Sequence, residues 1–124
     1  MPTSHYKPEL FLELAEKIID DKDYDEKSKS RVAVGRAYYA TYHKASKKLT
    51  ELGRPIVGNE RVHQQAIDRL REIKPDLSDQ FSTLFGKRIE ADYYLDVDVR
   101  KDLARTSIRL AHIVIREIGN LKND

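Results

Sequence analysis

A chain of 124 residues suits one domain, and a core of that size can form without disulfides or a structural metal. With 35% charged residues, only 5 Gly and 4 Pro, the composition favours helices, and the absence of cysteine excludes disulfides, thiol nucleophiles and thiolate zinc sites. The net charge of +2 arises from 23 basic and 21 acidic residues, so overall charge excludes no class of partner and points to none.

Five helices are predicted from the apolar periodicity and from the residues that interrupt it. The first begins near Pro8, a residue suited to the first helical position, and ends by the acidic pair at positions 20 and 21. The second runs from about Asp25 to Leu52 and stops at Gly53, because glycine readily adopts the positive φ found after a helix C-terminus. It is the longest predicted helix, so we expect it at the centre of the fold.

The third predicted helix extends from about Asn59 to Ile73, with Asn59 as its cap and Pro75 marking its end. A fourth starts near Asp76 and a fifth near Val99. The residues expected to face the core, helix by helix, are Leu10, Phe11, Leu14, Ala15 and Ile18; Val34, Tyr38, Thr41, Tyr42, Ala45, Leu49 and Leu52; Val62, Ala66, Leu70 and Ile73; Leu77, Phe81, Leu84 and Phe85; and Leu103, Leu110, Val114, Ile118 and Leu121. These patterns predict an all-α fold, with one helical domain over residues 1–124.

Several classes of function find no support in the sequence. No stretch approaches the ~20 consecutive apolar residues of a membrane-spanning helix, and the N-terminus lacks the apolar run of a signal peptide. There is no Gly-rich phosphate loop and no His-Glu-x-x-His motif, and His63, near a helix start, is interpreted as a surface or capping residue. We therefore expect a cytoplasmic protein with no membrane contact, no metal and no cofactor.

The second helix carries a strip of residues that suits neither bare surface nor a dry core. The strip lies between the core face of the helix and its lysine-rich face, and it comprises Val32, Arg36, Tyr39, Ala40 and His43. Its apolar groups are poorly suited to open water, whereas its two basic groups are costly to bury. We therefore expect the strip to meet a partner, and we predict a homodimer that forms through it.

Three segments together resemble the HEPN family of small helical proteins. They are SRVAVGRAYYATYHKA at 30–45, VHQQAIDRL at 62–70 and LFGKRIEADYYLDVDV at 84–99. The residues that fit the family pattern are Arg36, Tyr38, Tyr39, Ala40 and His43 in the first segment, His63 in the second, and Arg88, Ala91, Asp92 and Tyr93 in the third. The likeness lies in the order and spacing of these residues and covers nearly the entire chain.

The resemblance implies an up-and-down helical bundle, frequently a homodimer, with roles in toxin–antitoxin pairs, phage defence and RNA cleavage. It also implies that the chain could work with a separate minimal nucleotidyltransferase. Many HEPN nucleases cleave RNA without metal, using an arginine and a histidine that follows it in the segment before the last helix. Here the positions of that histidine are occupied by Tyr93, Tyr94 and Leu95, so the chain departs from the nuclease pattern.

Arg36 and His43 are the one remaining Arg and His combination within these motifs, and we consider them a candidate catalytic pair. Metal-independent RNA cleavage needs a base for the 2′-hydroxyl proton, an acid for the leaving oxygen and a cation for the phosphate. The two residues are separated by about 10 Å along the helix axis, a gap that the long arginine side chain could bridge. In the alternative structural interpretation, Arg36 pairs with a carboxylate between helices and His43 belongs to a hydrogen-bond network.

Arg88 is predicted to point inward and to pair with Asp92, because an unpaired buried guanidinium is costly. Tyr93 could add a hydroxyl to the pair. These residues either form a clamp at the entry to the last helix or orient Arg36 and His43 as supporting groups.

The last helix has a basic stripe opposite its apolar face, and no acidic residue interrupts the stripe. It consists of Lys101, Arg105, Arg109, His112 and Arg116. The stripe would suit the phosphates of a nucleic acid, and the alternative interpretation is an ordinary solvated face.

Two functional hypotheses follow. The first is a binding module that lacks nuclease chemistry, acts in a toxin–antitoxin, defence or RNA-directed context, and binds RNA, a nucleotide or a partner nucleotidyltransferase. The second is an active metal-independent endoribonuclease that uses Arg36 and His43, with Tyr39 and the Arg88 segment in support. The missing histidine after Arg88 favours the first hypothesis.

Overall fold

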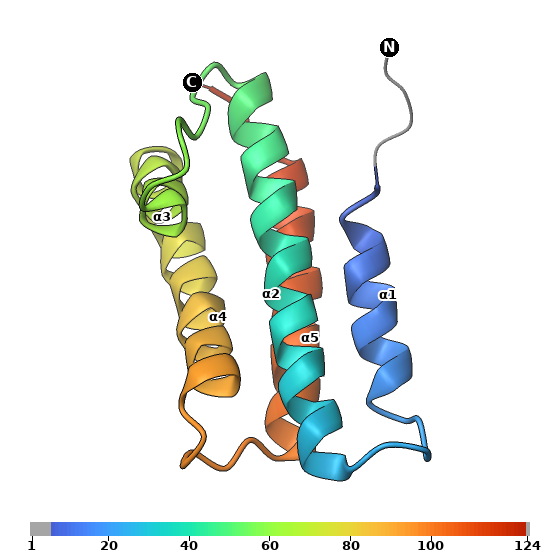
Figure 1. Ribbon diagram of the computed structural model, residues 1–124. Helices are drawn as coiled ribbons and strands as arrows, with labels where there is room; N and C mark the ends of the chain where they lie inside the picture. The colour runs from blue at the N-terminus through green and yellow to red at the C-terminus, as the bar shows by residue number, and fades with distance from the viewer. Residues whose placement is uncertain (1–5, 124) are drawn as a thin grey trace.

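The computed structural model describes residues 6–123, which form five helices and no strand. The helices are α1 (Glu9–Ile18), α2 (Glu26–Glu51), α3 (Val62–Ile73), α4 (Pro75–Tyr93) and α5 (Lys101–Gly119). In Figure 1, α1 and α4 run in one direction and α2 and α5 in the other, while the short α3 lies across one end. The predicted all-α, up-and-down bundle is confirmed. With 26 residues α2 is the longest helix, and it packs against each of the other four.

Local signals explain most of the helix ends. The carboxylate of Asp25 accepts hydrogen bonds from the backbone N–H of Ser28 at 2.9 Å and from its hydroxyl at 3.0 Å, which caps α2. Gly53, with φ of 76°, follows the C-terminus of α2. Pro75 occupies the first position of α4, so the same proline that ends α3 starts the next helix.

The predicted start of α3 at Asn59 is wrong, because the helix begins at Val62. Two residues just before Val62 have a left-handed backbone: Gly58 has φ of 66° and Arg61 has φ of 52°. A right-handed helix cannot continue through such residues, so the turn around positions 58–61 delays the first helical hydrogen bonds.

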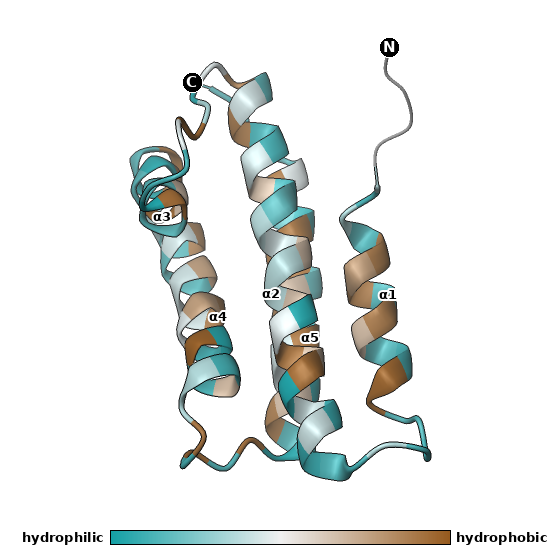
Figure 2. Cartoon of the chain, in the orientation of Figure 1, coloured by the Kyte–Doolittle hydropathy of each residue, from teal (hydrophilic) through white to brown (hydrophobic). Residues whose placement is uncertain are grey.

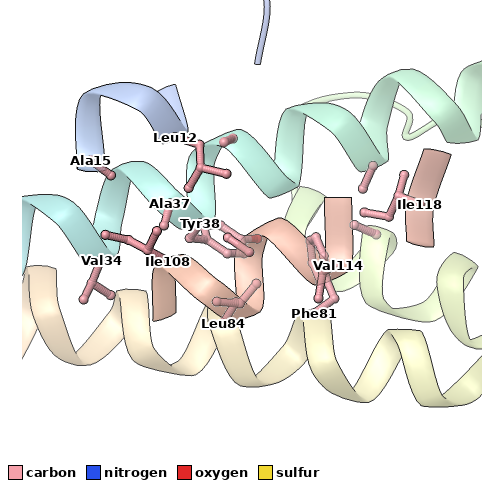
Figure 3. Close-up of a cluster of buried hydrophobic side chains, with 14 of the residues drawn as sticks. Leu12, Ala15, Val34, Ala37, Tyr38, Phe81, Leu84, Ile108, Val114 and Ile118 are labelled. Atoms are coloured by element: carbon pink, nitrogen blue, oxygen red, sulfur yellow. The ribbon is translucent and has the colours of Figure 1, made fainter. Parts of the chain in front are cut away.

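The core lies where α2 faces α1, α4 and α5, and Figure 3 shows side chains from all four helices meeting there. Tyr38 and Phe81 are the largest side chains that are fully buried. Much of the predicted α2 core face is confirmed, although Tyr42 and Leu52 are only partly buried. Ala40, which we expected in the partner strip, is fully buried, because small residues let neighbouring helices approach α2 on several sides.

The apolar face predicted for α1 is partly wrong. Leu10 and Leu14 are 39% and 45% exposed, whereas Leu12, Ala15 and Ile19 point into the core. Apolar residues extend around much of this short helix (Figure 2), so its periodicity alone does not identify the buried side. Within residues 6–123, none of the helices combines the length and the apolar composition needed to cross a membrane.

Candidate functional site

Two arginines from different helices lie beside the Tyr39 ring. The guanidinium carbon of Arg36, on α2, is 4.5 Å from the ring centroid, and that of Arg88, on α4, is 5.8 Å away. Arg36 also lies 5.5 Å from the ring centroid of Phe11, on α1. Cation–π contacts of this kind hold guanidinium groups in place without neutralising their charge. We call Arg36, Tyr39, His43 and Arg88 the arginine–tyrosine face.

His43 joins this face through stacked rings. Its imidazole lies 5.6 Å from Tyr39 and 5.8 Å from Phe11, with interplanar angles of 16° and 19°. Because Arg36 contacts the same two rings, the structure brings the candidate pair Arg36 and His43 into one cluster. Burial, and then the positive charge of Arg36, lower the pKa of His43, which favours its neutral form. Among the described residues Arg36 has no carboxylate partner, so the structural interpretation of Arg36 as an interhelical ion pair is wrong.

Arg88 pairs with Asp92, as predicted. Its Nε atom lies 2.9 Å from Oδ2 of Asp92, and the two side chains are 12% and 33% exposed. The buried Nε–H is not aligned with a hydrogen-bond acceptor in the described part of the chain, so the pair is held by charge more than by a directed hydrogen bond. Tyr93 contributes its ring, 5.3 Å from the Arg88 guanidinium carbon, and not the hydroxyl contact we expected.

Two residues that sequence reasoning did not single out position this pair. Arg31 of α2 donates hydrogen bonds to the carbonyl oxygens of residues 90, 91, 94 and 95 at 3.3, 2.9, 3.3 and 3.5 Å, and also to that of Val97. It therefore holds the last turn of α4 and the segment after it. At Gly35 an added Cβ would lie 3.3 Å from Oδ1 of Asp92, so glycine allows α4 to approach α2 here.

From the sequence, His63 is interpreted as a surface or capping residue. In the structure it packs against aromatic rings and does not cap α3. Its Nδ1 lies 2.6 Å from the hydroxyl oxygen of Tyr38, and its ring stacks on Phe85 at 5.0 Å. Burial raises the pKa of Tyr38, so the hydroxyl keeps its proton, and the hydroxyl and Nδ1 share one hydrogen bond. The imidazoles of His43 and His63 both contact Tyr42, with centroids 5.3 and 4.7 Å from its ring.

The lowered histidine pKa values predict how stability depends on pH. Burial, then the charges of Arg88 and His43, lower the pKa of His63 in the folded chain. Below about pH 6.5 the unfolded chain then binds more protons than the folded chain, so the free energy of unfolding should decrease on acidification. Urea unfolding at about pH 7.5 and about pH 5.5 measures this decrease, in a range where carboxylates titrate little. The decrease should shrink in a His43→Gln, His63→Gln double variant, and an unchanged decrease would contradict the assignment.

The basic stripe on α5 is not free of acidic neighbours, contrary to our expectation. Asp20, just after α1, lies 2.6 Å from Arg105 and 3.6 Å from Lys101. Glu16 lies 3.2 Å from the His112 imidazole. The helical wheel of α5 could not reveal these carboxylates because they come from the neighbouring α1 segment. Of the predicted nucleic-acid-binding residues, only Arg109 and Arg116 have no carboxylate partner among residues 6–123.

The site residues therefore form one aromatic and basic region spread over α1, α2, α3 and α4. Within the described residues, no group of three or more His, Asp or Glu side chains is placed to hold a metal ion. The region offers guanidinium groups for anions, ring faces for stacking and two imidazoles for proton transfer.

Comparison with known proteins finds a relative of almost the same length. No family model matches the chain. The chain is 29% identical over 123 residues to a UPF0332 protein of Archaeoglobus fulgidus, and the alignment covers 93% of this chain and 94% of that protein. The similarity is weak in identity but extends over almost the whole length of both proteins. The relative's name states no reaction, ligand or partner.

Proposed function

We propose that this chain is a HEPN-like helical module that binds RNA through the arginine–tyrosine face. The observation that carries the proposal is the placement of Arg36 beside two aromatic rings with no carboxylate partner in the described residues. A guanidinium in this state is available for the bidentate hydrogen bonds that phosphates accept, and the adjacent rings suit unstacked bases. Arg88 has a supporting role and is not the main phosphate ligand, because its charge is already shared with Asp92.

The context we propose is a toxin–antitoxin or defence pair in which the module acts as a homodimer or with a partner nucleotidyltransferase. Exposed apolar residues lie on the neighbouring surface, which supports contact with another protein. They are Val32 at 42% exposed, Tyr93 at 62%, Tyr94 at 54% and Leu95 at 79%. Arg31, on α2, donates hydrogen bonds to the backbone at the end of α4 and just after it, so the backbone that carries these apolar side chains is fixed against α2.

A second candidate function, metal-independent RNA cleavage, is favoured by the two imidazoles around Tyr42. Neutral His43 would take the proton from a 2′-hydroxyl as that oxygen attacks the adjacent phosphorus. The bond from phosphorus to the 5′-oxygen would then break, and the leaving oxygen would take its proton from the small protonated fraction of His63, whose pKa is lowered. Arg36 would stabilise the charge on the phosphate. We rank this function second because Tyr93, Tyr94 and Leu95 replace the histidine of the nuclease pattern.

Single-stranded RNA incubated with the protein in EDTA separates the two functions. We expect wild-type protein to bind the RNA and leave it intact. Arg36→Gln should weaken binding about tenfold, the loss expected for a charge-assisted hydrogen bond. Cleavage in EDTA that disappears in His43→Ala would instead establish the nuclease. If wild-type protein binds no RNA even at low salt, the RNA proposal is wrong and the protein-partner hypothesis remains.

A further inference from the structure

A wide groove opens beside the first turn of α1, next to the arginine–tyrosine face. Its volume is about 1010 Å³, which exceeds the space that one nucleotide needs. The lining residues are Tyr6, Lys7, Pro8, Glu9, Phe11, His43, Lys44 and Lys47. Phe11 and His43 line the groove and also contact Tyr39, so the groove and the face form one continuous surface.

The wall of this groove is aromatic. The Tyr6 ring lies 4.9 Å from Phe11, and Phe11 in turn stacks on His43 at 5.8 Å. Tyr6 is 60% exposed, so the outer ring of the series is accessible from solvent. Exposed ring faces beside positive charge are the usual platform for nucleic-acid bases, because every base has a face that can stack.

The rim of the groove is positively charged. Three lysines lie on it, and its single carboxylate, Glu9, is 3.3 Å from the Nζ atom of Lys44. Lys7 and Lys47 have no ion-pair partner in the part of the chain that the structure describes. An anionic ligand with flat rings, such as a nucleotide, matches this combination of charge and aromatic surface.

We infer that a single strand of RNA lies along the seam between α1 and α2, from Arg36 to the groove. One phosphate would bind Arg36, a base would stack on the Tyr6 and Phe11 wall, and the next phosphates would meet Lys47 and Lys7. The helix rises about 16 Å between positions 36 and 47. That length suits about four nucleotides. Duplex RNA does not fit, because its bases are already stacked inside the helix.

This inference rests on the proposed function and locates the strand away from the α5 stripe. The stripe is partly neutralised by Asp20 and Glu16, whereas the seam keeps Arg36, Lys7 and Lys47 unpaired within residues 6–123. Sequence reasoning favoured α5 because its basic residues share one helix face. The seam draws its residues from two helices, so no single periodicity indicates it.

Fluorescence of a Tyr6→Trp variant tests the inference, since the chain has no other tryptophan. A short single-stranded oligoadenylate should quench this fluorescence by stacking on the indole. Lys7→Gln combined with Lys47→Gln should weaken binding and lower the magnitude of the slope of log affinity against log salt by about 1.4, since each lost phosphate contact on a single strand contributes about 0.7. The matched control, Arg109→Gln combined with Arg116→Gln on α5, removes the same charge and should leave affinity and slope unchanged.

The outcomes separate this inference from the proposed function. If Arg36→Gln weakens binding but the lysine variant and the tryptophan probe do not respond, the groove is not part of the RNA site and the proposed function stands. If the α5 variant weakens binding and the lysine variant does not, the strand lies on α5. Adenosine monophosphate that binds as tightly as the oligonucleotide, and equally well to Arg36→Gln, would overturn the strand path in favour of a free nucleotide.

Discussion

Replacing Tyr38 with alanine is expected to lower the free energy of unfolding by about 4 kcal/mol, within the range known for truncation of large aromatic residues in cores. Tyr38 is fully buried, and its ring lies 5.5 Å from Phe81 and 5.4 Å from Phe85. Loss of the ring leaves a cavity between α2 and α4 and removes the hydrogen-bond partner of His63 Nδ1. Urea unfolding followed by circular dichroism measures the change.

The variant Tyr38→Phe separates packing from the hydrogen bond. It keeps the ring but loses the hydroxyl that lies 2.6 Å from Nδ1 of His63. We expect a cost of about 1 kcal/mol, because His63 is only partly buried and water can replace the lost hydroxyl. Equal costs for the two variants would mean that the hydrogen bond, and not the packed ring, dominates at this position.

Replacing Asp92 with alanine is expected to cost about 3 kcal/mol, because it leaves the guanidinium of Arg88 without its counter-charge in a largely buried position. The Arg88 side chain is 12% exposed, and its closest carboxylate oxygen is 2.9 Å away in Asp92. The same urea measurements apply. Because the variant leaves the Arg88 guanidinium beside the Tyr39 ring without its carboxylate, it should strengthen RNA binding if the arginine–tyrosine face binds RNA.

The two partners of this pair should not be equivalent. Arg88→Met keeps an unbranched stem for packing and leaves Asp92, which is 33% exposed and can be solvated, so we expect a cost of about 1 kcal/mol. The control is Glu90→Gln, which breaks the exposed pair with Lys87 at 3.9 Å on the same helix and should cost less than about 0.5 kcal/mol. A cost for Asp92→Ala no larger than that of the control would show that water screens the Arg88 charge.

Much of the fold could be predicted because its determinants are local. Asp25 caps α2 through a residue three positions away, and Gly53 and Pro75 act through their own backbones. The predictions failed where the outcome depends on more than local sequence. The start of α3 depends on the backbone of a turn, and the buried side of α1 depends on which neighbouring helix it meets.

The candidate site, like the fold, could be predicted from the sequence only in part. Arg36, Tyr39 and His43 lie within two turns of one helix, and Arg88 and Asp92 are four residues apart, so helical periodicity could group each set. Periodicity could not reveal that α1 places Phe11 against His43 or that α3 places His63 under the Tyr38 hydroxyl. Such contacts join residues from different helices, and only the packed structure defines them.

The anchoring of the segment after α4 has an evolutionary consequence. Arg31 binds this segment through carbonyl oxygens, which every amino acid supplies, while the side chains of Tyr94 and Leu95 point largely into solvent. Mutations at these two positions can therefore accumulate without loosening the backbone. Related proteins are free to diverge in the partners they recognise here while inheriting the same helical frame, provided that the arginine at position 31 is retained.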